Sequence, residues 1–249
     1  MQNEFEFLTF NVRCLQDFNK RQKVFHYVQD KINPHGIAFI QETHSTSNDN
    51  AKWQSEWKGE VLFSNFKSNA RGVAILFSQG SNIVYDKITR DTEGRIIIAS
   101  LQFNGQKLLL LNLYNNNDQK GQLETISSLN TLLDYHYCDE VVPIFAGDLN
   151  LIFGEKDYKL GNPILKLKSL AAITNIIEKL DLCDIFRVRF PDKKRFTFCQ
   201  KKPLLFRRLD YVFITGVLQQ HVKKIDILPS ILSDHSPVFL NIDYVVNDC

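Results

Sequence analysis

Short apolar runs typical of β-strands recur along the chain, and most of them end in a polar or acidic side chain. In the first run, residues 4–11, Phe5, Phe7, Thr9 and Asn11 would share one face of a strand, and Glu6, Leu8 and Phe10 the other. Further runs predict strands at residues 36–40, 72–77, 95–103, 107–114, 141–146, 209–214 and 238–242. Asn104-Gly105 separates two of these runs and predicts a tight hairpin turn.

Three other segments have helical spacing. Apolar residues recur every three or four positions at residues 20–32, 123–133 and 165–180. These helices alternate with groups of strands instead of following every strand, which favours a layered α/β domain with mixed sheets over a strictly parallel βαβ fold. No Pro/Gly/Ser linker, low-complexity tract or fixed-period repeat divides residues 1–249, so we expect one domain.

The composition is that of an ordinary soluble protein, with 44% apolar and 23% charged residues. No apolar run approaches the roughly 18–20 residues that span a bilayer. The acidic start lacks the basic-then-apolar order of a signal peptide, so we expect neither a membrane protein nor a secreted one. The cysteines (Cys14, Cys138, Cys183, Cys199 and Cys249) show no CxxC spacing, and we expect reduced, buried thiols in a cytosolic or nuclear compartment.

Polar side chains stand in or next to the predicted strands at positions where an apolar residue would be expected. They are Asn11, Gln41-Glu42-Thr43-His44, Asn112, Tyr114, Asp148, Asn150, Asp210 and Ser233-Asp234-His235. A carboxylate there is costly unless it is paired, hydrogen-bonded or bound to metal. A structural ion pair would explain any single acid, but four acids with a histidine and amides favour convergence into one cleft.

The donor types also indicate which metal such a cleft would hold. Carboxylate and amide oxygens suit Mg²⁺ or Mn²⁺, whereas Zn²⁺ would require more histidine or thiolate. Mg²⁺ typically takes only one or two protein carboxylates, so Glu42 is the natural principal ligand and the other acids are free for proton handling. A metal with several positioned donors suits phosphodiester cleavage, because general acid–base catalysis alone supplies only ~10²–10⁴-fold.

Basic residues gather in one part of the chain, between positions 187 and 208. They are Arg187, Arg189, Lys193, Lys194, Arg195, Lys201, Lys202, Arg207 and Arg208, with Asp192 the one acid among them. A solvated charged face is the ordinary explanation of such a run. A phosphate-facing surface is the functional alternative.

Taken together and in order, these motifs resemble those of the endonuclease/exonuclease/phosphatase superfamily, and within it the apurinic-type endonuclease domain of LINE-type non-LTR retrotransposons. The similarity extends from Phe10-Asn11 through Gln41-Glu42-Thr43-His44, 72–76, 112–114, 147–150, 196–198 and 208–211 to 233–237. It implies an α/β fold, a four-layer αββα sandwich of two mixed sheets flanked by helices, with the site at one edge.

The resemblance also implies catalytic roles. Glu42, with Asn11, would hold Mg²⁺, with Mn²⁺ as a substitute. Asp148 would orient and deprotonate the attacking water, and Asn150 would fix that water or a phosphate oxygen. His235 would contact the scissile phosphate, held in place by Asp210. The remaining implied members are Tyr114, which would support the phosphate or the leaving group, and Asp234, in the acidic cluster near the metal.

A further group would contact phosphate or DNA, or would position neighbouring side chains. It comprises Thr197, Ser233, Arg71, Lys201, Lys202 and Arg207. In similar retrotransposon enzymes a hairpin within residues 197–210 reaches into DNA beside the cut; the alternative is a surface loop whose apolar tip packs on the domain. Two departures affect the neighbouring loops: Asn115-Asn116-Asn117 follows Tyr114, and Val12-Arg13-Cys14 replaces a segment that often has glycine.

The activity that these features imply is nicking of double-stranded DNA to leave a 3′-hydroxyl, which a covalently linked reverse transcriptase would extend in the nucleus. The chain would then be the N-terminal module of a longer polyprotein and, as an isolated domain, a monomer. A cellular apurinic/apyrimidinic endonuclease of base-excision repair is the alternative. A catalytically silent nucleic-acid-binding module is a third hypothesis, which the full set of acids, histidine and tyrosine disfavours.

Overall fold

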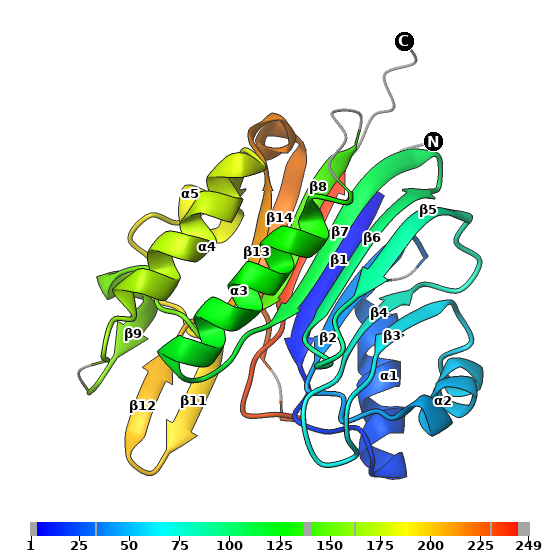
Figure 1. The fold of residues 1–249 in the computed structure, drawn as a ribbon, viewed down its shortest axis with the longest axis horizontal. Helices are drawn as coiled ribbons and strands as arrows, with labels where there is room; N and C mark the ends of the chain where they lie inside the picture. Colours follow the sequence, from blue (N-terminus) through cyan, green and yellow to red (C-terminus); the bar gives the residue numbers. More distant parts are fainter. Residues whose placement is uncertain (1–3, 33, 137–140, 162, 230, 244–249) are drawn as a thin grey trace.

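Two six-stranded sheets pack face to face, and helices cover their outer faces (Figure 1). This arrangement is seen in a computed structural model, which describes residues 4–32, 34–136, 141–161, 163–229 and 231–243. The predicted four-layer αββα sandwich of mixed sheets is therefore confirmed.

The first sheet has the strand order β14-β15-β1-β2-β4-β3. Only β1 and β2 are parallel neighbours in it; the other pairs are antiparallel. The strands are β1 (Glu4–Asn11), β2 (Gly36–Gln41), β3 (Val61–Ser64), β4 (Val73–Phe77), β14 (Val222–Ile227) and β15 (Val238–Asp243).

The second sheet has the order β10-β13-β8-β7-β6-β5, and β7 and β8 are its parallel pair. Its strands are β5 (Ile83–Arg90), β6 (Ile96–Phe103), β7 (Gln106–Tyr114), β8 (Val142–Asp148), β10 (Leu182–Asp184) and β13 (Asp210–Thr215). Asn104 and Gly105 form the predicted hairpin turn between β6 and β7, and both have a positive φ, 48° and 87°. Asparagine and glycine tolerate that conformation best.

Helices α1 (Phe18–Ile32) and α2 (Asn50–Trp57) cover the first sheet, and α3 (Gln119–Leu133) and α4 (Leu167–Lys179) cover the second. Val24, Val28 and Ile32 of α1 are buried against Leu8 and Phe10 of β1, as the periodicity predicts. A short helix α5 (Ile185–Arg189) and 3₁₀ turns at Ser47–Asp49, Glu155–Asp157 and Gly216–His221 complete the helical elements.

A small third sheet lies at one end of the sandwich. It has the order β11-β12-β9, with β9 (Tyr158–Lys159), β11 (Phe198–Lys201) and β12 (Leu204–Arg207). Strands β11 and β12 form the hairpin that the resemblance implied, and Figure 1 shows it projecting beyond the two main sheets. Its tip is thus not packed against the domain, since Lys201, Lys202 and Leu204 are exposed.

The core between the sheets changes from apolar to polar toward this same end. On β1, Phe5 and Phe7 lie in the inter-sheet core, and Thr9 and Asn11 continue the same face. Gln41 of β2 joins the two sheets there, because its Nε2 donates to Thr9 Oγ1 (3.1 Å) and to Asn112 Oδ1 of β7 (2.8 Å). The inner faces of the strands therefore supply both the core and the polar end.

No helix of the described residues is long and apolar enough to cross a membrane. Cys14, Cys183 and Cys199 are free, as predicted, but they are partly exposed and not buried, because they lie in a loop, a short edge strand and the projecting hairpin. Cys138 and Cys249 fall outside the described residues.

Candidate active site

Strand pairing brings the polar strand ends together at one edge of the sandwich. Asn11 and Gln41 are partners at the ends of β1 and β2, and Tyr114 and Asp148 are partners at the ends of β7 and β8. Strand β13 runs antiparallel to β8, so its first residue, Asp210, pairs with Asp148. The segment that leads into β15 passes the end of β1 for the same reason.

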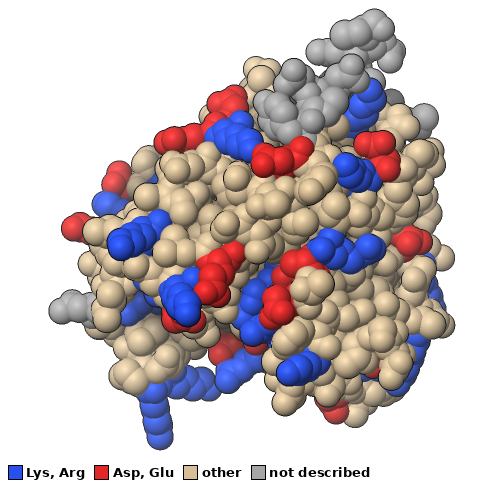
Figure 2. Space-filling model, in the orientation of Figure 1, with Lys and Arg blue, Asp and Glu red and all other residues tan. Residues whose placement is uncertain are grey.

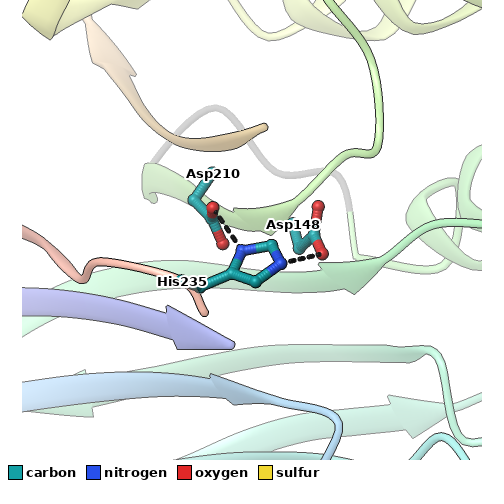
Figure 3. A group of neighbouring side chains, drawn as sticks. All are labelled: Asp148, Asp210 and His235. Carbon is teal, nitrogen blue, oxygen red and sulfur yellow. Dashed lines mark hydrogen bonds and ion pairs between the residues drawn. The ribbon is translucent and has the colours of Figure 1, made fainter. Parts of the chain in front are cut away.

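Asp210, His235 and Asp148 form the buried centre of the site. Figure 3 shows the His235 ring between the two carboxylates. His235 Nδ1 lies 2.8 Å from Asp210 Oδ2, and His235 Nε2 lies 4.0 Å from Asp148 Oδ2. The first contact is a hydrogen bond, whereas the second is longer than one and leaves Nε2 free for another acceptor.

Burial and charge set the protonation of this centre. Burial would lower the pKa of His235, but the charge and hydrogen bond of Asp210 outweigh it and raise that pKa to about 9. Burial, together with the nearby Asp210 charge, raises the pKa of Asp148 to about 7. At neutral pH His235 is thus a cation, while Asp148 is near its pKa and can change between carboxylate and carboxylic acid.

Asn11 connects this centre to Glu42. Its Nδ2 donates to Glu42 Oε1 and to Asp148 Oδ2, both at 2.9 Å, and its Oδ1 accepts from the Arg13 amide at 3.0 Å. Asn11 was predicted to hold the metal with Glu42. In this structure its amide fixes two carboxylates, and its role at the metal stays a prediction.

Glu42 has the properties expected of a cation ligand. Its side chain is about one-fifth exposed, and His44 Nε2 lies 3.9 Å from Glu42 Oε2. Burial lowers the pKa of His44, so the imidazole favours the neutral form and does not neutralise Glu42. A partly exposed carboxylate that a neutral imidazole leaves charged suits a divalent cation.

The buried centre itself satisfies the geometric requirement for a metal, since donor atoms of Asp148, Asp210 and His235 lie within 4.8 Å of one another. Asp210 Oδ2 occupies His235 Nδ1, and the raised pKa of His235 favours the cationic imidazole, which is a poor metal ligand. Glu42 is therefore the carboxylate that we expect to hold a metal ion.

Tyr114 and Asn150 complete the inner wall. Burial, and then the Glu42 and Asp148 charges, raise the pKa of Tyr114 far above its usual value, so its hydroxyl remains a donor beside Glu42. The Asn150 amide N–H donates to Asp148 Oδ1 at 3.0 Å, and Asn150 Nδ2 donates to the Asn115 carbonyl at 3.0 Å. Asn150 thus holds Asp148 in place and is itself held by the chain that follows Tyr114.

Thr197 and Ser233 act mainly on the backbone. The buried Thr197 Oγ1 accepts from the amides of Leu209 (3.0 Å) and Asp210 (3.1 Å), and Ser233 Oγ accepts from the His235 amide at 3.2 Å. Two roles were expected for Thr197, and these bonds support the positioning of neighbouring residues. Its side chain is buried and is not open to a phosphate in solution. Ser233 remains partly exposed.

Asp234 was expected in the acidic cluster near the metal, but the structure gives it a cationic partner. Its Oδ2 pairs with Nη1 of Arg13, a residue that was not among the predicted site residues. The one signal for Arg13 in the sequence was the departure Val12-Arg13-Cys14 directly after Asn11.

The basic run between Arg187 and Arg208 does not form one exposed surface, so neither the solvated face nor the phosphate-facing alternative describes the whole run. Arg208 is buried between Asp157 and Asp184, and Arg187 also pairs with Asp157. Arg207, expected at DNA, is buried and donates to the carbonyls of Leu160 (2.9 Å) and Phe206 (2.8 Å), so it anchors the hairpin.

The exposed cations of the run include Lys201 and Lys202 at the hairpin tip, and Figure 2 shows basic atoms projecting where Figure 1 places that hairpin. Arg71 is partly exposed, pairs with Glu93 and lies over the Phe66 ring at 4.3 Å. A phosphate would have to compete with Glu93 for Arg71, whereas the two lysines have no acidic neighbour among the ion pairs of the described chain.

Comparison with known sequences identifies relatives. A sequence profile described as the Endonuclease/Exonuclease/phosphatase family matches residues 8–235. The chain is also 26% identical over 208 residues to the transposon TX1 uncharacterized 149 kDa protein of Xenopus laevis. That match covers 83% of this chain and 16% of the length of the relative.

Solved structures share the fold. An AP endonuclease from Leishmania major superposes with a TM-score of 0.74 at 18% identity over 97% of this chain and 88% of that one. The 3′ phosphatase NExo from Neisseria, bound to product DNA hairpin, gives 0.75 at 18% identity over 96% and 99%. An AP endonuclease from Archaeoglobus fulgidus gives 0.73 at 21% identity over 96% and 100%.

Proposed function

The chain belongs to the endonuclease/exonuclease/phosphatase family, and from this premise we propose that it is a Mg²⁺-dependent endonuclease that nicks double-stranded DNA. The observation that carries the proposal is the buried Asp210–His235–Asp148 centre beside Glu42, at the edge where β7 and β8 end and β13 begins. A cation held by Glu42, with Mn²⁺ as a substitute for Mg²⁺, would stabilise negative charge on the phosphate.

The residues of the chain supply the proton transfers and the positioning. Asp148, with a pKa near neutrality, takes a proton from the attacking water, whose oxygen bonds to phosphorus. His235 donates from Nε2 to a phosphate oxygen, and Asp210 keeps it cationic and oriented. The bond from phosphorus to the 3′ oxygen breaks, Tyr114, whose hydroxyl stays protonated, would donate a hydrogen bond to the leaving oxygen, and that oxygen takes its proton from solvent. The products are a 5′-phosphate and a 3′-hydroxyl.

The biological role we propose is priming of reverse transcription for a retrotransposon. The similarity to the Xenopus transposon protein supports this role, as does the small share of that protein that the chain covers. A covalently linked reverse transcriptase would then extend the 3′-hydroxyl, and the enzyme would act in the nucleus.

A supercoiled plasmid tests the activity. We expect nicking in Mg²⁺ and none in EDTA, and a DNA polymerase should extend the nick without prior phosphatase treatment. Absence of nicking in Mg²⁺ and Mn²⁺ would indicate a silent binding module, and a nick that cannot be extended would remove the priming role.

A cellular repair endonuclease is the second candidate, favoured by the structural similarity to two AP endonucleases. The two candidates differ in substrate. A duplex with one abasic site and the matched intact duplex should be cut at comparable rates by a retrotransposon enzyme, whereas a strong preference for the abasic duplex would support repair.

A further inference from the structure

Arg13 is an exposed cation at the entrance to the proposed active site. Its side chain is 65% exposed and pairs with Asp234, the residue directly before His235. An ion pair of this kind contributes little to stability, because water screens both charges. The pair can therefore open at small cost when another anion is offered.

The backbone at this position gives no reason for an arginine. Arg13 has a φ of 48° and Cys14 a φ of 76°, a left-handed conformation that favours glycine. The conformation is fixed from both sides, since the Arg13 amide donates to Asn11 Oδ1 at 3.0 Å and its carbonyl accepts from Lys20 Nζ at 2.7 Å. Any benefit of arginine here must come from its guanidinium.

A groove of about 840 Å³ extends from Arg13 and Asp234 along β11 to Lys201. It is directly connected to the catalytic centre, because the Phe198 ring lies 5.0 Å from the His235 ring and the Cys199 amide donates to the Asp234 carbonyl at 3.1 Å. A DNA strand seated in the groove would thus pass from the hairpin to His235, with Arg13 beside it. Its charged lining contains two cations and one anion, and that anion is already paired with Arg13.

We propose that Arg13 binds a DNA phosphate next to the scissile one, on the hairpin side of the cut, by exchanging the Asp234 carboxylate for the phosphate. The inference rests on the proposed function. Arginine suits this exchange, because its planar guanidinium pairs with two phosphate oxygens at once. Asp234 holds the guanidinium over the groove until DNA arrives.

Arg13→Gly separates binding from folding, because glycine relieves the left-handed backbone while it removes the side chain. Binding of a duplex oligonucleotide is measured in EDTA as a function of salt. The slope of log K against log salt is negative, and each lost phosphate contact lowers its magnitude by about 0.9. We expect that decrease in Arg13→Gly with no loss of thermal stability, and a retained slope in Arg13→Lys. Lys223→Ala, which removes a different paired cation at the start of β14, should keep the wild-type slope.

A second comparison excludes an indirect effect of charge. If Arg13 only neutralises Asp234, Arg13→Gly should leave the salt dependence of DNA binding unchanged in an Asp234→Asn background. If Arg13 binds phosphate, the magnitude of the slope should fall in that background too. An unchanged slope in either background overturns the inference about Arg13. If the wild-type protein still nicks DNA in Mg²⁺, the proposed function is unaffected by that result. A wild-type protein that neither binds nor nicks DNA overturns both.

Discussion

His235 Nδ1 lies 2.8 Å from Asp210 Oδ2, and both side chains are buried at the edge of the sandwich. The contact links the start of β13 to the segment before β15, two strands that belong to different sheets. It also determines the charge of His235, because Asp210 raises its pKa against the opposing effect of burial.

The first prediction concerns pH. The raised pKa keeps His235 cationic up to about pH 9, so kcat/KM should fall as the pH rises through that value. Asp210→Asn keeps the shape but removes the charge, which lowers the pKa of His235 and moves this alkaline limb to lower pH. A pH profile of kcat/KM checks the shift, with Asp226→Asn as control. If the alkaline limb of Asp210→Asn stays at the wild-type pH, Asp210 does not set the charge of His235.

The second prediction concerns the metal. Glu42→Gln preserves an acceptor for Asn11 Nδ2 but loses the charge that a cation requires. We expect the Mg²⁺ concentration for half-maximal nicking to rise roughly tenfold or more, equivalent to ~1.4 kcal/mol of binding free energy. Mn²⁺ binding, followed by electron paramagnetic resonance, provides a readout independent of activity. Glu178→Gln on the exposed side of α4 is the control, and equal Mn²⁺ affinity in both variants would rule out Glu42 as the ligand.

The third prediction concerns the hairpin tip. Replacing Lys201 and Lys202 with alanine should lower the magnitude of the slope of log K against log salt, by up to ~1.8 if each lysine contacts one phosphate. It should also change the preferred nicking positions. The rate at saturating DNA should stay within about threefold of wild type, because neither lysine lies at the buried centre. Alanine at both Lys223 and Lys224 of β14 is the matched control. An unaltered cleavage pattern and slope would show that the hairpin tip does not contact DNA.

The fourth prediction concerns stability. Arg208 is buried and bonds Asp157 (2.7 Å) and Asp184 (2.6 Å), which ties the base of the hairpin to α5. Arg208→Met leaves Asp184 without its cation, so the free energy of unfolding should fall by about 3 kcal/mol, the lower end for a broken buried pair because Arg187 still binds Asp157. Urea unfolding measures the loss. Arg189→Met, at an exposed position, should cost under ~1 kcal/mol, and an equal loss in both variants would contradict this role.

The strands that form the centre of both sheets were predictable from sequence, because their inner faces are long and apolar. Strand β1 was predicted with its true bounds and faces, since Phe5 and Phe7 point into the inter-sheet core and Leu8 and Phe10 toward α1. Strand β5 was missed because it is an edge strand with mostly exposed side chains. Helix α2 was missed because it is short and is held by two buried tryptophans instead of a periodic apolar face.

The site was predictable as a set of residues but not as a network. Polar residues at the ends of apolar strands identified Asp148, Asp210 and His235, because strand ends meet at a sheet edge. Which arginines face solvent depends on tertiary partners that no local pattern reveals, so neither the burial of Arg207 nor the pairing of Arg13 with Asp234 was predicted.

The most direct test of the central claim is the rate at which Asp148→Asn nicks a supercoiled plasmid in Mg²⁺. Asparagine keeps the shape of the side chain, but its one carbonyl oxygen can accept from only one of the Asn11 and Asn150 donors, so circular dichroism and thermal unfolding must first show that the fold is retained. Because the general base is lost, we expect the rate to fall by at least ~10²-fold. A folded Asp148→Asn protein that nicks at close to the wild-type rate would contradict the proposed mechanism.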